Sequence, residues 1–87
     1  VDLNALRTFK AVVDAGGFSG AAHQSQRAVS SISRQIAALE TVLGQPLFYR
    51  HTRAVTLTEQ GKRYIDQVRP WLSALDEHTE ALFGDKS

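Results

Sequence analysis

Apolar residues near the amino end recur at intervals of three and four, which is the spacing of one helix face. The series consists of Leu3, Leu6, Phe9 and Val13, and a glycine pair follows it at 16–17. Polar residues such as Arg7 and Lys10 fall off this face. We therefore expect a first helix that buries its apolar face and ends at the glycine pair.

Two further helices are expected back to back after the glycine pair. Ser19 is a candidate N-cap of the second helix, with Phe18 packing back as a hydrophobic staple, and this helix should end near Gln26. The third helix has the clearest apolar stripe of the chain, formed by Ile32, Ile36, Leu39 and Leu43. Gly44 is expected to end the third helix as a left-handed C-cap, and Pro46 prevents it from resuming.

A short hairpin is expected after the third helix. Residues 47–49 and 55–57 have strand-forming composition, and 50–53 make a compact polar connection between them. The connection carries Arg50 and Arg53 at its ends, where arginines can grip phosphates or enter a narrow minor groove. Helix, turn, helix and arginine-bearing hairpin together predict a mainly α winged helix-turn-helix, a fold suited to a DNA groove.

The last part of the chain predicts a long amphipathic helix with Thr58 as N-cap. Its apolar face consists of Ile65, Val68, Trp71, Leu72, Leu75 and Leu82. Because a small domain offers little surface to cover such a stripe, we expect it to pack against the same helix of a second chain. A helix facing the core of its own protomer is the alternative. Pro70 lacks an amide hydrogen, so a kink is expected near 66–69.

Length and composition limit the remaining possibilities. The 87 residues allow one small domain, and the absence of cysteine excludes disulfides and thiolate metal sites and fits a reducing cytoplasm. No apolar run approaches the roughly 18 residues of a membrane helix, and the amino end lacks the plan of a signal peptide. We expect a soluble, cytoplasmic protein with no membrane partner and no cofactor.

Positive charge is concentrated in the segment expected to meet DNA. The net charge is only +1, but 15–58 contains four arginines and a single acid, Glu40. Such an excess favours binding to phosphates through counterion release, although an ordinary solvated face is the alternative. On the third helix, Ser30, Ser33 and Arg34 lie off the apolar stripe, where short hydroxyls and a planar guanidinium suit phosphates and guanine edges.

Over nearly its whole length the sequence resembles the amino-terminal DNA-binding domain of LysR-type transcriptional regulators. The matching segments are LNALRTFKAVVDAGGFSGAA (3–22), SRQIAALETVLGQPLFYRHTR (33–53) and LTEQG (57–61), and they align without gaps. The resemblance implies a winged helix-turn-helix over 1–57 and a linker helix over 58–87 that pairs two protomers. It also implies an effector-binding domain that this chain lacks, and through which alone a small-molecule effector would act.

The implied function is sequence-specific binding of double-stranded DNA by a homodimeric bacterial regulator, leaving a tetramer open for the full-length protein. The third helix, about 29–43, would enter the major groove, and the wing, 47–57, would contact the backbone or minor groove. The operator would be pseudo-palindromic, because two symmetric domains read two half-sites. The expected DNA contacts are Ser19, Ala28, Val29, Ser30, Ser33, Arg34, Gln35, Arg50 and Arg53.

The chain departs from the family pattern at the start of the third helix. The family usually has apolar residues at the positions of Ser25 and Arg27, and a Ser-Gln-Pro or Ser-Gln-Ser start at 28–30. Val29 cannot replace the hydrogen bonds of a glutamine, but its methyls can meet a thymine methyl, which predicts an altered base preference. Residues 25–30 also resemble the helix-start motif displaced by three positions; the ungapped register is preferred, because the displaced one shortens the second helix and its turn.

Two other function classes are the alternatives to DNA binding. An enzyme is not expected, because the three histidines, His23, His51 and His78, are scattered and no phosphate loop or nucleophile motif occurs. A winged helix used for protein association is the more serious alternative, since Val29 is an apolar residue at the expected reading edge. Steep weakening of duplex binding with rising salt would separate DNA binding from protein association.

Overall fold

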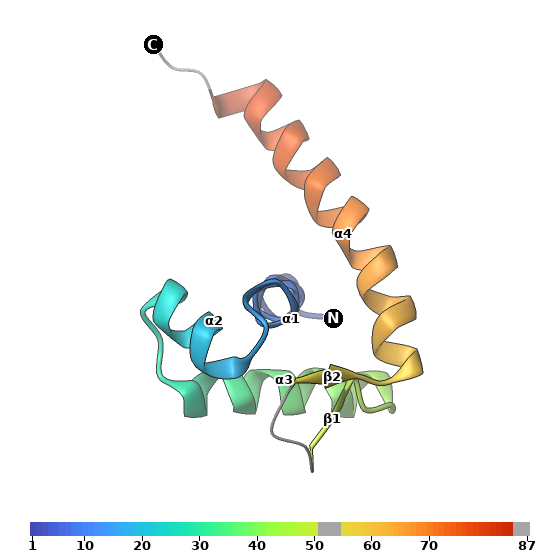
Figure 1. Ribbon diagram of the computed structural model, residues 1–87. Helices are drawn as coiled ribbons and strands as arrows, with labels where there is room; N and C mark the ends of the chain where they lie inside the picture. Colours follow the sequence, from blue (N-terminus) through green and yellow to red (C-terminus); the bar gives the residue numbers. More distant parts are fainter. Residues whose placement is uncertain (51–54, 85–87) are drawn as a thin grey trace.

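Three helices, a hairpin and a long final helix make up the computed structural model, which describes residues 1–50 and 55–84 (Figure 1). The elements in chain order are α1 (Leu3–Ala15), α2 (Phe18–Ser25), α3 (Val29–Leu43), β1 (Phe48–Tyr49), β2 (Thr56–Leu57), α4 (Glu59–Thr79) and a π-helical turn, η1 (Glu80–Gly84). The two strands are antiparallel, with Phe48 opposite Leu57 and Tyr49 opposite Thr56. This architecture confirms the predicted mainly α winged helix-turn-helix followed by a long helix.

The third helix has the predicted boundaries. α3 begins at Val29 and ends at Leu43, and Gly44 follows in the left-handed conformation with φ of 74°. The α2 helix ends at Ser25, and Gln26 caps it with φ of 56°, close to the expected stop. The ungapped register is therefore the one the chain adopts.

The predicted N-cap at Ser19 is wrong. α2 begins one residue earlier, at Phe18, and its N-cap is Gly17, which has no side chain to offer. The amide of Ala21 donates to the Gly17 carbonyl at 3.2 Å, so the first helical turn already includes Phe18 and Ser19. At the start of α4, by contrast, the Thr58 hydroxyl accepts from the amide of Gly61 at 3.0 Å, as predicted for an N-cap.

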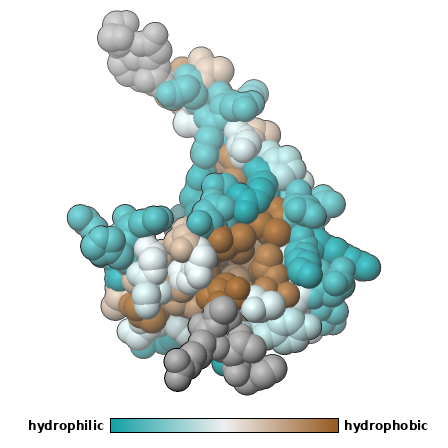
Figure 2. All heavy atoms as spheres, in the orientation of Figure 1, coloured by the Kyte–Doolittle hydropathy of each residue, from teal (hydrophilic) through white to brown (hydrophobic). Residues whose placement is uncertain are grey.

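Aromatic rings from distant parts of the sequence meet in the core. Phe9 of α1 is fully buried and lies edge-on to Phe48 of β1, with ring centroids 5.5 Å apart. Phe9 also stacks with Tyr64 of α4 at 5.9 Å, and Phe18 meets Phe48 edge-on at 5.6 Å. Figure 2 shows apolar residues gathered between the base of α4 and the three-helix body. The core thus joins all four helices and the wing.

The amino-terminal half of α4 belongs to this core, so the expectation that a small domain could not cover the apolar stripe is wrong there. Ile65, Val68 and Leu72 are only 5%, 0% and 3% exposed within one protomer. The reason is that α1 packs against α4 and covers this half of the stripe. The rest of α4 rises away from the body (Figure 1).

The far half of α4 remains uncovered. Trp71 and Leu75 of α4 and Leu82 of the following turn, η1, are 52%, 39% and 62% exposed. The helix continues without interruption through Pro70, and the kink stays a prediction. Within the described ranges, no helix combines the length and apolar character needed to span a lipid bilayer.

The start of α4 is pressed against the wing. The Thr58 amide donates to the Leu47 carbonyl at 3.0 Å, and its hydroxyl donates to the Pro46 carbonyl at 2.7 Å. Gly61 is buried, and a Cβ placed there would collide with the Leu47 carbonyl oxygen. These contacts fix the first strand of the wing between α3 and α4.

Candidate nucleic-acid interface

α3 has one face in the core and the opposite face in solvent. Ile32, Ile36 and Leu39 are buried against the rest of the body. Ser30, Arg34 and Ala37 follow a four-three spacing on the opposite side, and all three are exposed. α3 lies along the lower edge of the molecule in Figure 1, with α1 and α2 on its inner side. An outward helix face of this kind is what a groove-binding helix requires.

The expected DNA-contacting residues differ in accessibility. Those that are exposed are Ser19, Ala28, Val29, Ser30, Arg34 and Arg50. Ser33 and Gln35 are half-buried. Arg53 lies outside the described residues, so the structure places only one of the two wing arginines.

Arg34 is the exposed cation of the α3 outer face. Among the described residues, no carboxylate or carbonyl forms an ion pair or hydrogen bond with its guanidinium. Ser30, also exposed, lies one turn before it. The five donors of Arg34 are thus available for a phosphate or for the acceptors of a guanine.

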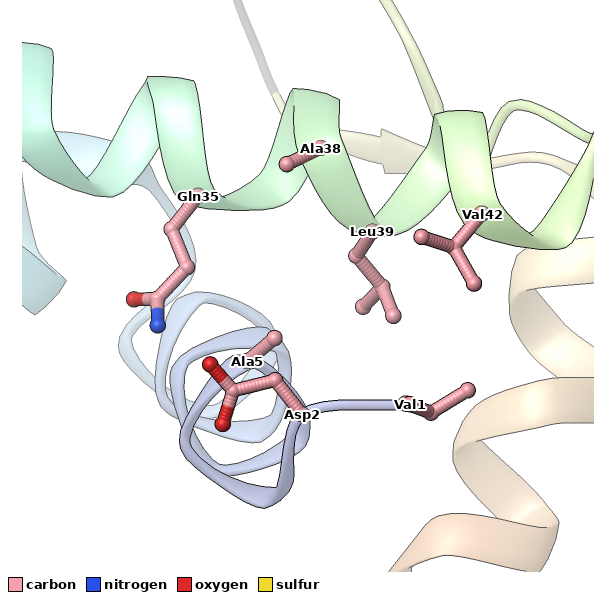
Figure 3. A pocket seen from close by; sticks show the side chains of 7 residues that line it. All are labelled: Val1, Asp2, Ala5, Gln35, Ala38, Leu39 and Val42. Atoms are coloured by element: carbon pink, nitrogen blue, oxygen red, sulfur yellow. The ribbon is translucent and has the colours of Figure 1, made fainter.

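Gln35, by contrast, uses its amide oxygen within the protein. Its Oε1 accepts from the Thr8 hydroxyl at 2.7 Å and from Nη1 of Arg27 at 2.9 Å. Figure 3 shows the Gln35 side chain directed from α3 toward α1, where it lines a pocket with Ala5 and Leu39. The family resemblance transfers the identity of a residue but not its neighbours, so sequence reasoning missed the partnership with Thr8 and Arg27.

The wing is attached to α3 by one carboxylate that sequence reasoning did not single out. Glu40 accepts from the backbone amides of Leu47 at 2.6 Å and Phe48 at 3.3 Å. It also forms an ion pair with Arg50, whose guanidinium lies 5.6 Å from the centroid of the Phe18 ring. Arg50 is therefore held in place by a carboxylate and an aromatic face. The role of Glu40 could have been suspected from the sequence, because Glu40 is the only acidic residue between 15 and 58.

The helix starts divide into two kinds. α1 and α4 have side-chain caps, since Asp2 accepts from the Asn4 amide at 2.9 Å and Thr58 caps α4. α2 and α3 have no side-chain cap, because Gly17 and Ala28 occupy their N-cap positions. Backbone amides at an uncapped helix start can bind anions such as phosphates.

Two acidic residues outside this region, Asp14 of α1 and Asp76 of α4, form ion pairs. Asp14 bonds Lys10 and Arg69, each at 2.8 Å, and these hydrogen bonds hold the pKa of the Asp14 carboxyl below its usual value. Arg7 bonds Asp76 at 2.8 Å and likewise lowers the pKa of that carboxyl. These two ion-paired carboxylates therefore lie on α1 and α4 and not on α3.

Comparison with known sequences gives one consistent family. Residues 3–62 match the model of the bacterial regulatory helix-turn-helix proteins of the lysR family. The transcriptional activator AllS of Salmonella typhimurium is 40% identical over 81 residues, or 93% of this chain. The regulator PecT of Dickeya dadantii is 40% identical over 82 residues, or 94% of this chain. The chain spans about a quarter (26%) of the length of these curated relatives.

Solved structures agree with the sequence comparison. The BenM DBD in complex with catB site 1 DNA has a TM-score of 0.90 at 34% identity, covering 94% of this chain and 91% of that one. The full-length virulence activator AphB of Vibrio cholerae has a TM-score of 0.85 at 35% identity, covering 94% of this chain and 28% of that one. These relatives are transcription regulators and not enzymes, and the chain belongs to the LysR family of bacterial helix-turn-helix regulatory proteins.

Proposed function

We propose that this chain binds double-stranded DNA sequence-specifically as the DNA-binding part of a LysR-type regulator, with α3 in the major groove. The observation that carries the proposal is the outward face of α3, where exposed Ser30 and Arg34 face away from the core. The similarity to the BenM DBD, which was solved on catB and benA site 1 DNA, supports the same assignment.

The residues of α3 make two kinds of contact with DNA, to base edges and to phosphates. Arg34 reads guanine through its planar fork, and Val29 meets a thymine methyl. Ser30 and Ser33, together with the uncapped start of α3 at Ala28, contact phosphates and fix the register on the duplex. Arg50, held against Glu40 and Phe18, and Arg53 contact the backbone or adjacent minor groove, and Ser19 adds a phosphate contact at the start of α2.

The protein acts as a homodimer through the far half of α4. Trp71 and Leu75 of α4 and Leu82 of η1 form the exposed apolar surface that supports this pairing. The buried residues of the stripe pack instead in the protomer's own core. Two symmetric α3 helices would then reach half-sites about one helical turn, or a multiple of it, apart. Effector binding belongs to a further domain beyond 87, as the greater length of the relatives suggests.

In vitro selection from random duplexes tests the proposal. The expected result is an inverted repeat, with binding that weakens steeply as salt rises. Replacing Arg34 with Ala should lower affinity for the selected duplex about 10- to 100-fold and affinity for random duplex much less. Arg63→Ala removes the same charge from an exposed site on α4 and is the matched control. Equal losses on both duplexes would make Arg34 a phosphate contact. A selection that enriches no sequence at all would overturn the proposal.

Sedimentation equilibrium tests the pairing through α4. The wild-type chain should approach a dimer as its concentration rises, and Leu75→Glu should shift it toward monomer. Gln67→Glu adds the same charge at another exposed position of α4 and should leave the association intact if Leu75 is in the interface. A wild-type chain that stays monomeric at high concentration would contradict this arrangement.

A further inference from the structure

The turn between α2 and α3 contains an arginine that bonds to two other elements. Nη1 of Arg27 donates to the Thr8 hydroxyl at 3.0 Å and to Oε1 of Gln35 at 2.9 Å. Thr8 in turn donates its own hydrogen to Oε1 of Gln35 at 2.7 Å. The three side chains form a closed set of hydrogen bonds that joins α1, the turn and α3.

The donor and acceptor chemistry of this cluster is complete. The Thr8 hydroxyl has one hydrogen, which goes to Gln35, and lone pairs that accept from Arg27. Thr8 is only 7% exposed, so water competes weakly at the centre of the cluster. Hydrogen bonds from a guanidinium are stronger than those between neutral groups, so Arg27 is the strongest link of the three.

The arginine of this cluster lies in the turn just before α3, and polar side chains hold this turn. In this chain Ser25 bonds the Ala21 carbonyl at 2.7 Å, and Arg27 bonds across to α1 and α3. Ala28 provides no side-chain cap for α3. The hydrogen bond from Arg27, just before the helix, to Gln35, within it, therefore helps to hold the start of α3 in place.

We infer that Arg27 is a positioning residue for DNA reading, which acts by holding Gln35 and thereby fixing how α3 is rotated on α1. Gln35 lies on the side of α3 that faces α1 (Figure 3). Its neighbour Arg34 is exposed. A change in the Gln35 link therefore turns or shifts Arg34 relative to a groove. The inference rests on the proposed function, because it needs a specific duplex to be read.

Thr8 offers the sharpest test, because it is buried and cannot touch DNA itself. Thr8→Val keeps the shape of the side chain and removes the hydroxyl, and Thr8→Ser keeps the hydroxyl. For Thr8→Val, the ratio of the affinity for the selected duplex to that for random duplex should drop roughly threefold to tenfold, because the variant loses the hydrogen bond to Gln35 and the one from Arg27. Thr8→Ser should retain the ratio. Thermal unfolding of each variant shows whether the fold is intact.

A double-mutant cycle between Arg27→Ala and Gln35→Ala supplies the second readout. Each single variant should lower the ratio of selected to random affinity about tenfold, and the double variant should cost little more than one of them, because both break the same link. Should the losses add fully, or Arg27→Ala weaken both duplexes alike with a shallower salt dependence, Arg27 would be a direct phosphate contact and the inference would fail. A wild-type chain that selects no duplex would overturn the proposed function and this inference together.

Discussion

The two sides of the molecule treat their polar groups differently. On the support side, formed by α1 and α4, both helix starts have side-chain caps, and ion pairs join Arg7 to Asp76 and Arg69 to Asp14. On the reading side, formed by α2 and α3, neither helix start has a side-chain cap. Arg34 also has no carboxylate partner among the residues described. The support side thus has capped helix starts and interhelix ion pairs, whereas the starts of α2 and α3 and the guanidinium of Arg34 have no such partners among the described residues.

The difference indicates where stability and binding are separable. Capped helices and paired charges raise the stability of the folded state without needing a partner. Exposed amides and an unpaired arginine contribute little to folding but bind an anion strongly when one arrives. Substitutions on the support side should therefore change the free energy of unfolding, and substitutions on the reading side should change affinity for DNA.

The largest effect is expected from removing the aromatic ring of Phe9, which is fully buried in the core. Phe9→Ala should lower the free energy of unfolding by about 3–5 kcal/mol, because it leaves a cavity beside Phe48 and Tyr64. Chemical denaturation measures the loss. Leu3→Ala, a half-exposed apolar site in the same helix, is the control and should cost far less. Similar losses for the two variants would mean that the core is not centred on Phe9.

A smaller loss is expected where α4 passes the wing. Gly61→Ala places a methyl against the Leu47 carbonyl, so α4 and β1 must move apart, at a cost of about 1–3 kcal/mol. Gln60→Ala changes the exposed neighbour in the same helical turn and should be nearly neutral. Thermal unfolding compares them. If Gly61→Ala raised the melting temperature, the greater helix propensity of alanine would outweigh the collision.

The reading side should accept a cap and gain stability. Ala28 has the extended backbone of an N-cap, so Ala28→Ser should stabilise the fold by about 0.5–1 kcal/mol. Ala28→Asp caps α3 equally well but brings a carboxylate to the expected phosphate contact, so its DNA affinity should fall. Unfolding and duplex binding measured on the pair separate the two effects. Equal DNA affinities would place the start of α3 away from the backbone.

The smallest effect is expected from the ion pairs on the support side. The pKa of the Asp14 carboxyl is lower in the folded chain than in the unfolded chain, first through hydrogen bonds from Lys10 and Arg69. Its contribution is therefore present above the unfolded pKa and is lost as the pH falls through the folded pKa. Because the side chain is 39% exposed, Asp14→Asn should cost only a few tenths of a kcal/mol at pH about 7.

Denaturation of wild type and Asp14→Asn at about pH 7 and about pH 2, at low salt, measures this contribution. The two proteins should converge in stability as the pH falls through the folded pKa of Asp14, because protonation leaves a neutral group at this position in both. A difference that persists unchanged at low pH would mean that the asparagine disturbs packing instead of charge pairing.

Local sequence patterns predicted the parts of this fold that local chemistry decides. The apolar stripe of α3, the left-handed Gly44 and the Thr58 cap depend on residues within one or two turns of each other, and the structure has all three. Ser19 failed as a cap because a glycine one position before Phe18 could serve equally well as a helix start. Two candidates for one cap that lie two positions apart cannot be separated by propensity alone.

Sequence reasoning about the candidate site was incomplete where the outcome depends on contacts across the fold. The apolar stripe of α4 is visible in the sequence, but periodicity does not say whether α1 or a second chain covers Val68. Likewise, Gln35 matches a family position, but its partners Thr8 and Arg27 lie 27 and 8 residues away in sequence. Only the packing of α1 on α3 brings the three side chains together.

The insertion of α4 into the core has a mechanical consequence. Because Val68 is buried with α1 and the same helix continues to Thr79, a torque applied at the far end is transmitted through α4 to the body. A helix of 21 residues is about 30 Å long, close to the distance of about 34 Å between successive major grooves on one face of DNA. In the proposed dimer, sliding one α4 helix along its partner by a single helical turn would change the distance between the two α3 helices by about 5 Å. The spacing of the operator half-sites would then depend on the register in which the two α4 helices pair, and measuring that spacing would report the register.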